Sequence, residues 1–200
     1  MYFHEKLDGK NVYLIADPHI GHKNIVYGES NWSDKTGCRS FDTTSQMNDE
    51  IIKSCRNTLN NDSILVILGD VLFGDKSKLY YWLEQIPSRE IHLIYGNHCD
   101  FIRKDKSLQG LFDSCNDYLE VFLRGRLGCY HLTCLFHYPI RTWRDKYKGS
   151  FCFSGHVHGV NPYPVNERAL DLDWNIWRRP MNFFELEDIL GKKTYTKLVN

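Results

Sequence analysis

Short clusters of polar side chains punctuate the sequence, and each follows an apolar stretch that is typical of a β-strand. They contain carboxylate, carboxamide and imidazole groups, which are ligands for divalent metal ions. The clusters are Asp17-Pro18-His19, Gly69-Asp70, Gly96-Asn97-His98, His137 and Gly155-His156-Val157-His158. Because ligands at the carboxyl ends of strands converge on one crevice in open α/β sheets, the pattern predicts one polynuclear metal site.

The spacing inside two of the clusters predicts which side chains act together. On extended backbone, side chains two residues apart point to the same side, whereas neighbours point to opposite sides. We therefore expect Asp17 and His19 to share one ion. By the same rule, His156 and His158 are expected to share one ion.

The third cluster joins a carboxamide to a neighbouring imidazole. If the side-chain oxygen of Asn97 binds metal, the imidazole of His98 faces elsewhere and is free for proton transfer. The glycines directly before Asp70, Asn97 and His156 suit close backbone turns that aim a ligand into a crowded site.

Each cluster taken singly also has an ordinary explanation. A Gly-Asp pair after a strand is usually a turn, and a His-x-His pair is more often polar surface than a ligand pair. The order of the clusters along the chain favours metal binding over these ordinary explanations, because most of the histidines lie in or beside the clusters. These are His19, His22, His98, His137, His156 and His158. We expect His4, His92 and His131 to be ordinary, the last two as core or sheet-face residues.

The ordered set Asp-x-His, Gly-Asp, Gly-Asn-His, His and Gly-His-x-His resembles the calcineurin-like metallophosphoesterase superfamily. The signature extends from Asp17 to His158. Further stretches resemble the small, compact members that are common in bacteria and their phages. These stretches are Asp17–Ile25, Arg39–Phe41, Met47-Asn48, Leu68–Gly74, His137–Pro139 and Arg179-Pro180.

The resemblance implies two metal ions and a proton donor. The implied ligands are Asp17, His19 and His158 for one ion, Asn97, His137 and His156 for the second, and Asp70 as the bridge. This donor set suits Mn, Fe, Zn, Ni or Co, with Mn favoured. In such a centre a metal-bound hydroxide attacks phosphorus. His98 would protonate the leaving alkoxide, a step worth roughly 10²–10⁴-fold in rate.

The sequence departs from the superfamily at two motifs: the second motif differs from that of its protein phosphatases, and the third differs from the usual Gly-Asn-His-Asp or Gly-Asn-His-Glu. In the protein phosphatases the second motif continues as Gly-Asp-x-x-Asp-Arg, where the later Asp orients the proton-donating His and the Arg binds phosphate. Here Phe73 and Gly74 stand at those positions, which speaks against a protein phosphatase. In the third motif Cys99 precedes Asp100, and we expect this cysteine to be a small buried packing residue.

Two loops are expected to shape a substrate pocket. Residues 26–46 are long and polar, and loops of that length are commonly functional. Residues 139–149 carry basic and aromatic side chains that could bind a nucleotide phosphate and base, although a solvated loop explains them equally well. We name His22 and Arg141 as substrate-binding residues, with Arg144 a further candidate.

The composition fits one soluble enzyme domain over residues 1–200. The chain contains 25 acidic and 25 basic residues, so net charge predicts no general affinity for nucleic acid. The first residues, Met1–Asp8, lack the long apolar segment expected of a signal peptide, and no apolar run approaches transmembrane length. Seven cysteines without CxxC spacing indicate reduced thiols in a cytoplasmic protein. The sequence does not predict an oligomeric state.

Periodicity predicts the main elements. Strands are expected near residues 11–16, 63–68, 90–95, 118–123, 129–136, 150–154 and 169–173, and helices over 45–59 and 76–86. A shorter helix is expected after Asn182, with Glu185 in a capping-box position. Residues 124–126 predict a hairpin turn. The pattern indicates a mixed α/β sheet system. The resemblance further implies a four-layer fold, in which two mixed β-sheets pack face to face with flanking helices.

These observations favour a phosphoesterase that acts on a small phosphodiester or phosphomonoester, with a nucleotide or cyclic nucleotide as the leading substrate. One alternative is a nuclease that acts on DNA or RNA ends, which would need more basic surface. Another is a non-catalytic scaffold on the same fold, but a scaffold would be expected to lose ligands that this sequence retains.

Overall fold

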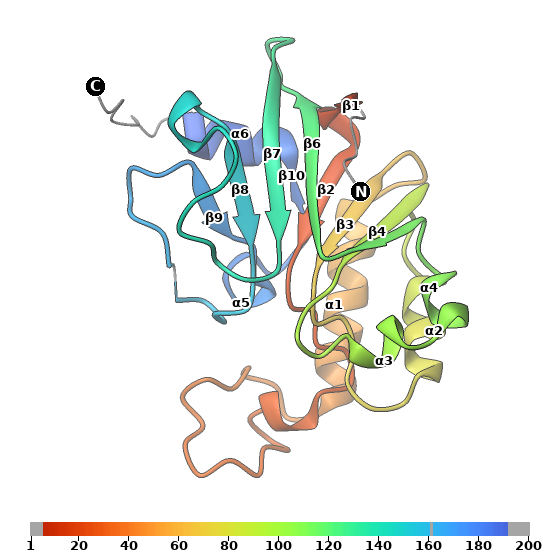
Figure 1. The fold of residues 1–200 in the computed structure, drawn as a ribbon. Coiled ribbons are helices and arrows are strands. Elements are labelled where there is room, and N and C mark those ends of the chain that lie inside the picture. The colour runs from red at the N-terminus through yellow and green to blue at the C-terminus, as the bar shows by residue number, and fades with distance from the viewer. Residues whose placement is uncertain (1–5, 161, 192–200) are drawn as a thin grey trace.

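In the part of the chain that the structure describes, two mixed β-sheets of five strands each pack face to face (Figure 1). The computed structural model describes residues 6–160 and 162–191. The sheet topology and the helices beside the sheets confirm the prediction of two mixed sheets with flanking helices. His4 lies outside the described residues.

The first sheet has the strand order β10-β2-β3-β4-β5. Its strands are β2 (Val12–Ile15), β3 (Ile64–Leu68), β4 (Glu90–Ile94), β5 (Ser114–Asn116) and β10 (Met181–Asn182). Strands β2 to β5 are parallel to one another, and β10 is antiparallel to β2. The loops after β2, β3 and β4 therefore leave the sheet at the same edge.

The second sheet has the strand order β1-β6-β7-β8-β9. Its strands are β1 (Lys6–Asp8), β6 (Tyr118–Arg124), β7 (Tyr130–Phe136), β8 (Phe151–Ser154) and β9 (Ala169–Asp171). Strands β6 and β7 form the predicted antiparallel hairpin, while β7, β8 and β9 are parallel. The loops after β7 and β8 are thus neighbours.

Alternation along the strands divides the apolar side chains between two cores. In β3, Val66 and Leu68 belong to the core between the sheets, whereas Leu65 and Ile67 belong to the core under the helices. Because both faces of β3 are covered, every residue of this strand is buried. This explains its uninterrupted apolar sequence.

Helices cover the outer face of the first sheet (Figure 1). They are α1 (Thr44–Thr58), α2 (Ser77–Leu83), α3 (Asp100–Arg103) and α4 (Lys106–Gln109). Helix α1 begins with a capping box, in which Thr43 and Gln46 each accept the other's backbone N–H. Met47, Ile51 and Cys55 then bury one face of α1 against the sheet.

The remaining layers combine short helices and loops. They include α5 (Trp174–Trp177), α6 (Phe183–Gly191) and the 3-10 turns η1 (Gly9–Asn11), η2 (Lys23–Ile25) and η3 (Lys146–Lys148). Trp143 and Tyr163, from two loops, pack with Cys134 and Cys152 on the outer face of the second sheet. This face is therefore covered largely by loops.

Short elements account for most differences from the sequence prediction. The long strands lie where expected, but β1, β5 and β10 were not predicted, nor were α3, α4 and α5. Helix α2 ends at Leu83 instead of residue 86. His92 and His131 lie on sheet faces as expected. They hydrogen-bond Ser114 at 2.9 Å and Glu187 at 2.9 Å respectively.

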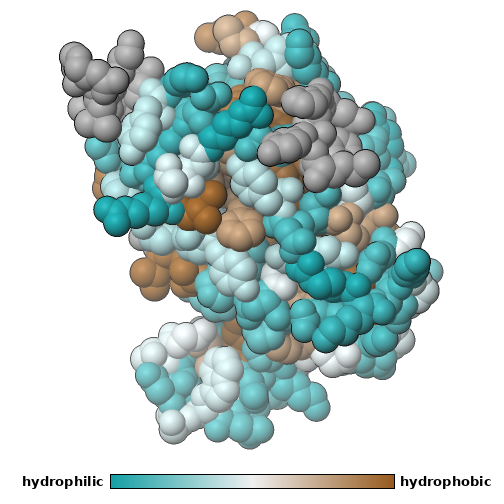
Figure 2. Space-filling model, in the orientation of Figure 1, coloured by the Kyte–Doolittle hydropathy of each residue, from teal (hydrophilic) through white to brown (hydrophobic). Residues whose placement is uncertain are grey.

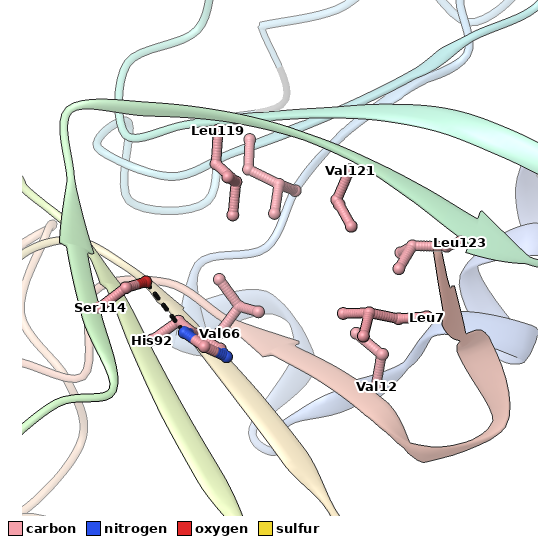
Figure 3. Close-up of a pocket in the computed structure, with 9 residues that line it drawn as sticks. Leu7, Val12, Val66, His92, Ser114, Leu119, Val121 and Leu123 are labelled. Atoms are coloured by element: carbon pink, nitrogen blue, oxygen red, sulfur yellow. Dashed lines mark hydrogen bonds between the residues drawn. The ribbon is translucent and has the colours of Figure 1, made fainter. Parts of the chain in front are cut away.

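A small cavity of about 20 Å³ lies between the sheets (Figure 3). Leu7, Val12, Val66 and Leu123 line it, and the His92–Ser114 hydrogen bond lies at its edge. Val12 is the first residue of β2, so the cavity reaches the amino-terminal end of this strand.

The face of the molecule in Figure 2 is largely hydrophilic, with apolar groups in small patches. Among the described residues, no helix combines the length and apolar character needed to cross a membrane.

Candidate metal centre

The predicted metal-binding residues occupy the loops at one end of both sheets. Asp17, Asp70 and Asn97 follow β2, β3 and β4, while His137 and His156 follow β7 and β8. Backbone hydrogen bonds tie these loops together. The His19 N–H donates to the Asp70 carbonyl at 3.0 Å, and the Gly155 N–H donates to the His137 carbonyl at 2.9 Å.

One group of possible ligand atoms belongs to Asp17, His19 and His158. One atom from each residue lies within 4.8 Å of the others. His19 Nε2 is 3.6 Å from Asp17 Oδ1, and the rings of His19 and His158 have centroids 4.9 Å apart. Asp17 and His19 are buried, whereas His158 is more exposed. The geometry brings these three residues together.

A second group contains Asp17, Asp70 and His137, again within 4.8 Å. His137 Nε2 lies 3.0 Å from Asn97 Oδ1 and 3.7 Å from Asp70 Oδ2. The His156 ring lies beside that of His137, at a centroid distance of 5.1 Å. The two groups share Asp17.

The backbone at these positions is not extended. Asp17, His19, Asp70, His156 and His158 all have positive φ angles, between 44° and 76°. The rule for extended strands therefore does not apply here. The expectation that His156 and His158 share one ion assumed extended backbone, and the backbone at both residues is not extended. His158 lies with His19, whereas His156 lies with His137.

Two of the glycines before these residues pack directly against carboxylates. A Cβ atom on Gly96 would collide with Asp70 Oδ1, and one on Gly155 would collide with Asp17 Oδ2. The missing side chain lets the backbone come close enough to donate. His98 N–H donates to Asp70 Oδ1 at 2.8 Å, and His156 N–H donates to Asp17 Oδ2 at 2.7 Å.

The polar atoms of this site fit a bound cation. Asp17 Oδ1 and both ring nitrogens of His19 are buried without a hydrogen-bond partner among the described residues. Burial and the nearby carboxylate of Asp173 raise the pKa of Asp17 well above its usual value. Burial and the charge of Arg39 lower the pKa of His19 well below its usual value, which favours the neutral imidazole that binds metal. A cation here would satisfy these groups.

Partners outside the predicted set orient two of the histidines. Asp173 Oδ2 lies 2.9 Å from His158 Nδ1, and the Leu68 carbonyl lies 2.9 Å from His137 Nδ1. Such contacts fix the ring and leave Nε2 for a metal. Asp173 was not among the residues predicted from the sequence. The sequence pattern that could have indicated its role is Asp171-Leu172-Asp173, which places two carboxylates at the end of a predicted strand.

Arg39 is a buried cation beneath the first group. Its guanidinium donates to the carbonyls of Asp17 at 2.7 Å and Pro18 at 2.8 Å, and to the side chain of Asn175. Burial lowers the pKa of Arg39 to about 10, so it remains charged at pH 7. Arg39 comes from the long loop before α1 and holds the backbone that carries Asp17.

His98 lies at the exposed side of the centre. Its side chain is 46% exposed, and its Nε2 is 3.9 Å from Asp70 Oδ2. The neighbouring Cys99 is fully buried, as predicted, and burial raises the pKa of its thiol to about 11. His98 is thus placed beside the metal-binding groups with an accessible ring.

The predicted substrate-binding residues lie in two different surroundings. The His22 ring is 5.4 Å from that of His19 by centroid, so it lies beside the first group. Arg141 is exposed and lines a cavity of about 490 Å³ with Pro139, Tyr163 and other loop residues. Arg144 instead forms an ion pair with Glu120 at 2.8 Å, which speaks against its candidacy.

Comparisons with known proteins identify the family and the fold of the chain. No curated protein matches the sequence. A crystal structure of a protein of unknown function from Aquifex aeolicus is similar in fold, with a TM-score of 0.57 and 20% sequence identity over 92% of this chain and 100% of that one. The calcineurin-like phosphoesterase family matches residues 10–179. The chain therefore belongs to the calcineurin-like phosphoesterase family.

Proposed function

We propose that the protein is a binuclear metal-dependent hydrolase of small phosphodiesters and phosphomonoesters, with nucleotides or cyclic nucleotides as substrates. Membership of the family supports a metal-dependent phosphoesterase in general. The observation that carries the finer proposal is the convergence of two groups of ligand atoms at one end of the sheets. The unpartnered atoms of Asp17 and His19 lie in the same place.

Two ions would be held by side chains from these two groups together with Asn97 and His156, whose side chains lie beside His137. We assign one ion to Asp17, His19 and His158, the second to Asn97, His137 and His156, and the bridging role to Asp70. This role is supported because a carboxylate oxygen of Asp70 lies within 4.8 Å of ligand atoms of both Asp17, assigned to the first ion, and His137, assigned to the second. When bound, such ions supply charge against the phosphate and activate water. Asp17, which belongs to both groups, is the competing candidate for the bridge.

His98 is proposed as the proton donor to the leaving oxygen. Its backbone is anchored by the hydrogen bond to Asp70 Oδ1, while its ring is accessible. A general acid must reach the leaving group from the edge of the site, and an accessible ring beside the ligands meets that requirement.

The substrate's remaining parts would contact His22 and Arg141. His22 lies beside the first ligand group, where it can reach a phosphate oxygen. Arg141 lines the 490 Å³ cavity, and this volume falls in the range of pockets that bind small molecules. Pro139 and Tyr163 give the cavity apolar walls. These features support a small organic phosphate as the substrate.

A preference for diesters follows from the residues after Asp70. Phe73 and Gly74 provide no cation at the position where protein phosphatases have an arginine. A doubly charged monoester therefore lacks one bidentate partner, whereas a singly charged diester depends on it less.

A substrate panel tests the proposed function. The purified protein is loaded with Mn²⁺ and assayed on bis(nitrophenyl) phosphate, nitrophenyl phosphate, cyclic nucleotides, a phosphoserine peptide and a single-stranded oligonucleotide, with Asp70→Asn as the control. We expect kcat/KM for the diester at least equal to that for the monoester, and negligible phosphopeptide turnover. A monoester preference of roughly tenfold, about 1.4 kcal/mol, would contradict the diester assignment. Preferential cleavage of the oligonucleotide would instead identify a nuclease.

A further inference from the structure

Phe73 lies among the histidines at the edge of the metal centre. Its ring stacks on that of His22, with a centroid distance of 3.7 Å and an interplanar angle of 8°. It also contacts the ring of His98 at 4.4 Å and 48°. One aromatic side chain thus touches both the proposed proton donor and a proposed substrate-binding residue.

The backbone of Phe73 is held firmly in place. Its N–H donates to the Ile20 carbonyl at 2.8 Å, and Ile20 and Leu72 form a parallel bridge. The Ile20 N–H in turn donates to the Val71 carbonyl at 3.0 Å. The loops after β2 and β3 therefore run side by side and hold the backbone from which the Phe73 side chain extends.

The ring of His98 has fewer fixed contacts. Its nearest acidic atom, Asp70 Oδ2, is 3.9 Å from Nε2, which is beyond hydrogen-bond range. The ring is also about half exposed. Within residues 6–160 and 162–191, its nearest ring contact is with Phe73 at a centroid distance of 4.4 Å, against 6.2 Å for the ring of His19.

The His22 ring is held from two sides. Phe73 covers one face, and the ring of Trp32, from the long loop before α1, lies at a centroid distance of 5.9 Å and an interplanar angle of 82°. The Nδ1 atom of His22 is buried without a hydrogen-bond partner among the described residues. Among the described residues, ring contacts therefore hold the plane of this imidazole without a hydrogen bond to Nδ1.

We propose that Phe73 is a positioning residue that orients His98 for proton donation and His22 for contact with the substrate phosphate. Phe73 stands at the position where protein phosphatases of the superfamily carry an aspartate that orients the proton-donating histidine. Here a flat apolar ring performs this task by packing. The inference rests on the proposed function, because it assigns roles in phosphate ester hydrolysis to both histidines.

The kinetic test uses two substrates with different leaving groups. We compare Phe73→Leu, which removes the flat ring, with Phe73→Tyr, which retains it. On a cyclic nucleotide, whose alkoxide leaving group needs a proton, we expect Phe73→Leu to lower kcat roughly tenfold, the upper range for one aromatic contact. On bis(nitrophenyl) phosphate kcat should fall far less, because nitrophenolate needs little protonation. KM should rise for both substrates, because His22 is no longer oriented for contact with the phosphate. Phe73→Tyr should retain the wild-type kcat and KM.

A double variant shows whether Phe73 acts through His98. If it does, Phe73→Leu combined with His98→Ala should have the same kcat on the cyclic nucleotide as His98→Ala alone. Additive losses in the double variant would overturn the inference. So would equal kcat losses on both substrates, or loss of bound metal in Phe73→Leu measured by elemental analysis.

A second readout does not depend on activity. In the metal-free protein with labelled histidines, NMR should show nuclear Overhauser effects from the Phe73 ring to the imidazole protons of both His22 and His98. Their absence would overturn the inference whatever the enzyme hydrolyses. If they are present and the wild-type protein hydrolyses none of the esters, the proposed function fails while the orientation of the two rings by Phe73 is supported.

Discussion

At the scale of single residues, five of the proposed ligands have backbone conformations that non-glycine residues rarely adopt. Such conformations cost about 1–3 kcal/mol each and persist only where the surroundings enforce them. Two of the carboxylates also hold neighbouring loops through their side chains. Asp17 uses Oδ2 to hold the loop of His156, and Asp70 uses Oδ1 to hold the loop of His98. Each carboxylate therefore has one oxygen engaged by the backbone and a second that faces the histidines.

The bridging carboxylate can be identified by counting bound ions in three variants. Asp70→Asn should lower the occupancy of both ions, because we assign Asp70 to both. His19→Ala and Asp17→Asn should each deplete mainly one ion. Elemental analysis of the purified, metal-loaded variants measures this. Asparagine retains an oxygen that can accept the loop N–H, so the backbone contacts are preserved. Two ions retained in Asp70→Asn would exclude it as the bridge, and loss of both ions only in Asp17→Asn would transfer the role to Asp17.

A second prediction at this scale concerns Asp173, which holds His158 through Nδ1 at 2.9 Å. Asp173→Asn removes the charge that orients this ring, and we expect the affinity for the first ion to fall roughly 10–100-fold. The second ion should bind as before. Competition with a chelator during Mn²⁺ titration measures both affinities. Asp62→Asn, at an exposed position, is the control. Unchanged affinity in Asp173→Asn would show that the contact does not support metal binding.

At the scale of elements, the loop before α1 supports the site through the buried side chain of Arg39. Most of the loop is exposed, but Arg39 is buried and binds the Asp17 and Pro18 carbonyls. It also lies over the Trp174 ring at 5.0 Å. A segment that looks like a surface insertion in the sequence is thus a structural part of the metal centre.

Arg39→Ala should therefore destabilise the metal-free protein. It leaves two buried carbonyls without donors and removes a cation from buried carboxylates, so we expect the free energy of unfolding to fall by about 3 kcal/mol. Urea unfolding followed by fluorescence measures the change. Ser33→Ala, in the same loop but exposed, should stay within about 0.5 kcal/mol of wild type. An Arg39→Ala variant as stable as the Ser33→Ala control would show that the loop does not anchor the site.

Helix α6 offers a pH-dependent prediction. Glu185 accepts from Arg179 at 2.8 and 2.9 Å and from the Asn182 N–H at 3.1 Å, and these contacts lower its pKa below 4.5. A lowered pKa in the folded state stabilises the protein above the unfolded pKa, and this stabilisation is lost as pH falls through the folded pKa.

Glu185→Gln keeps the capping box but removes the charge. Because the pair is partly exposed, we expect a loss of only about 0.5 kcal/mol at pH 7. The difference from wild type should shrink towards zero below pH 4.5. Urea titrations from pH 7 to acid pH measure this. A difference that stays constant would show that the ion pair does not contribute.

The elements differ in how well the sequence could predict them. Helix α6 was expected because Asn182 and Glu185 form a local signal that needs no distant partner. Strands β1, β5 and β10 contain two or three residues each and show no periodic pattern. They are strands because a longer neighbour pairs with them, and that pairing is not encoded locally.

At the scale of the whole molecule, the two sheets are joined directly beside the metal centre. Ala16 and Asp173 form a parallel bridge between the ends of β2 and β9, so Asp173 is brought next to Asp17. The clusters of candidate ligands were visible in the sequence because each is a short motif after a strand. The positions of Arg39, Phe73 and Asp173 depend on contacts between distant segments, so local patterns could not reveal their roles.

Substitutions in the inter-sheet core at the end far from the metal centre should lower the stability of the protein without changing its metal content. Leu123 is fully buried beside the small cavity in Figure 3, and Leu127, in the turn of the same hairpin, is 91% exposed. Leu123→Ala enlarges an existing cavity, so we expect the free energy of unfolding to fall by about 3 kcal/mol. Leu127→Ala should change it by less than about 0.5 kcal/mol.

Metal content should remain at the wild-type level in both leucine variants, because Leu123 lies near the end of β6 that is far from the ligands. Urea unfolding and elemental analysis of the same preparations check the two expectations together. If Leu123→Ala lost metal while still folded, the inter-sheet core and the centre would be coupled along the whole length of the strands. If it matched Leu127→Ala in stability, the packing between the sheets at this end would contribute little to holding them together.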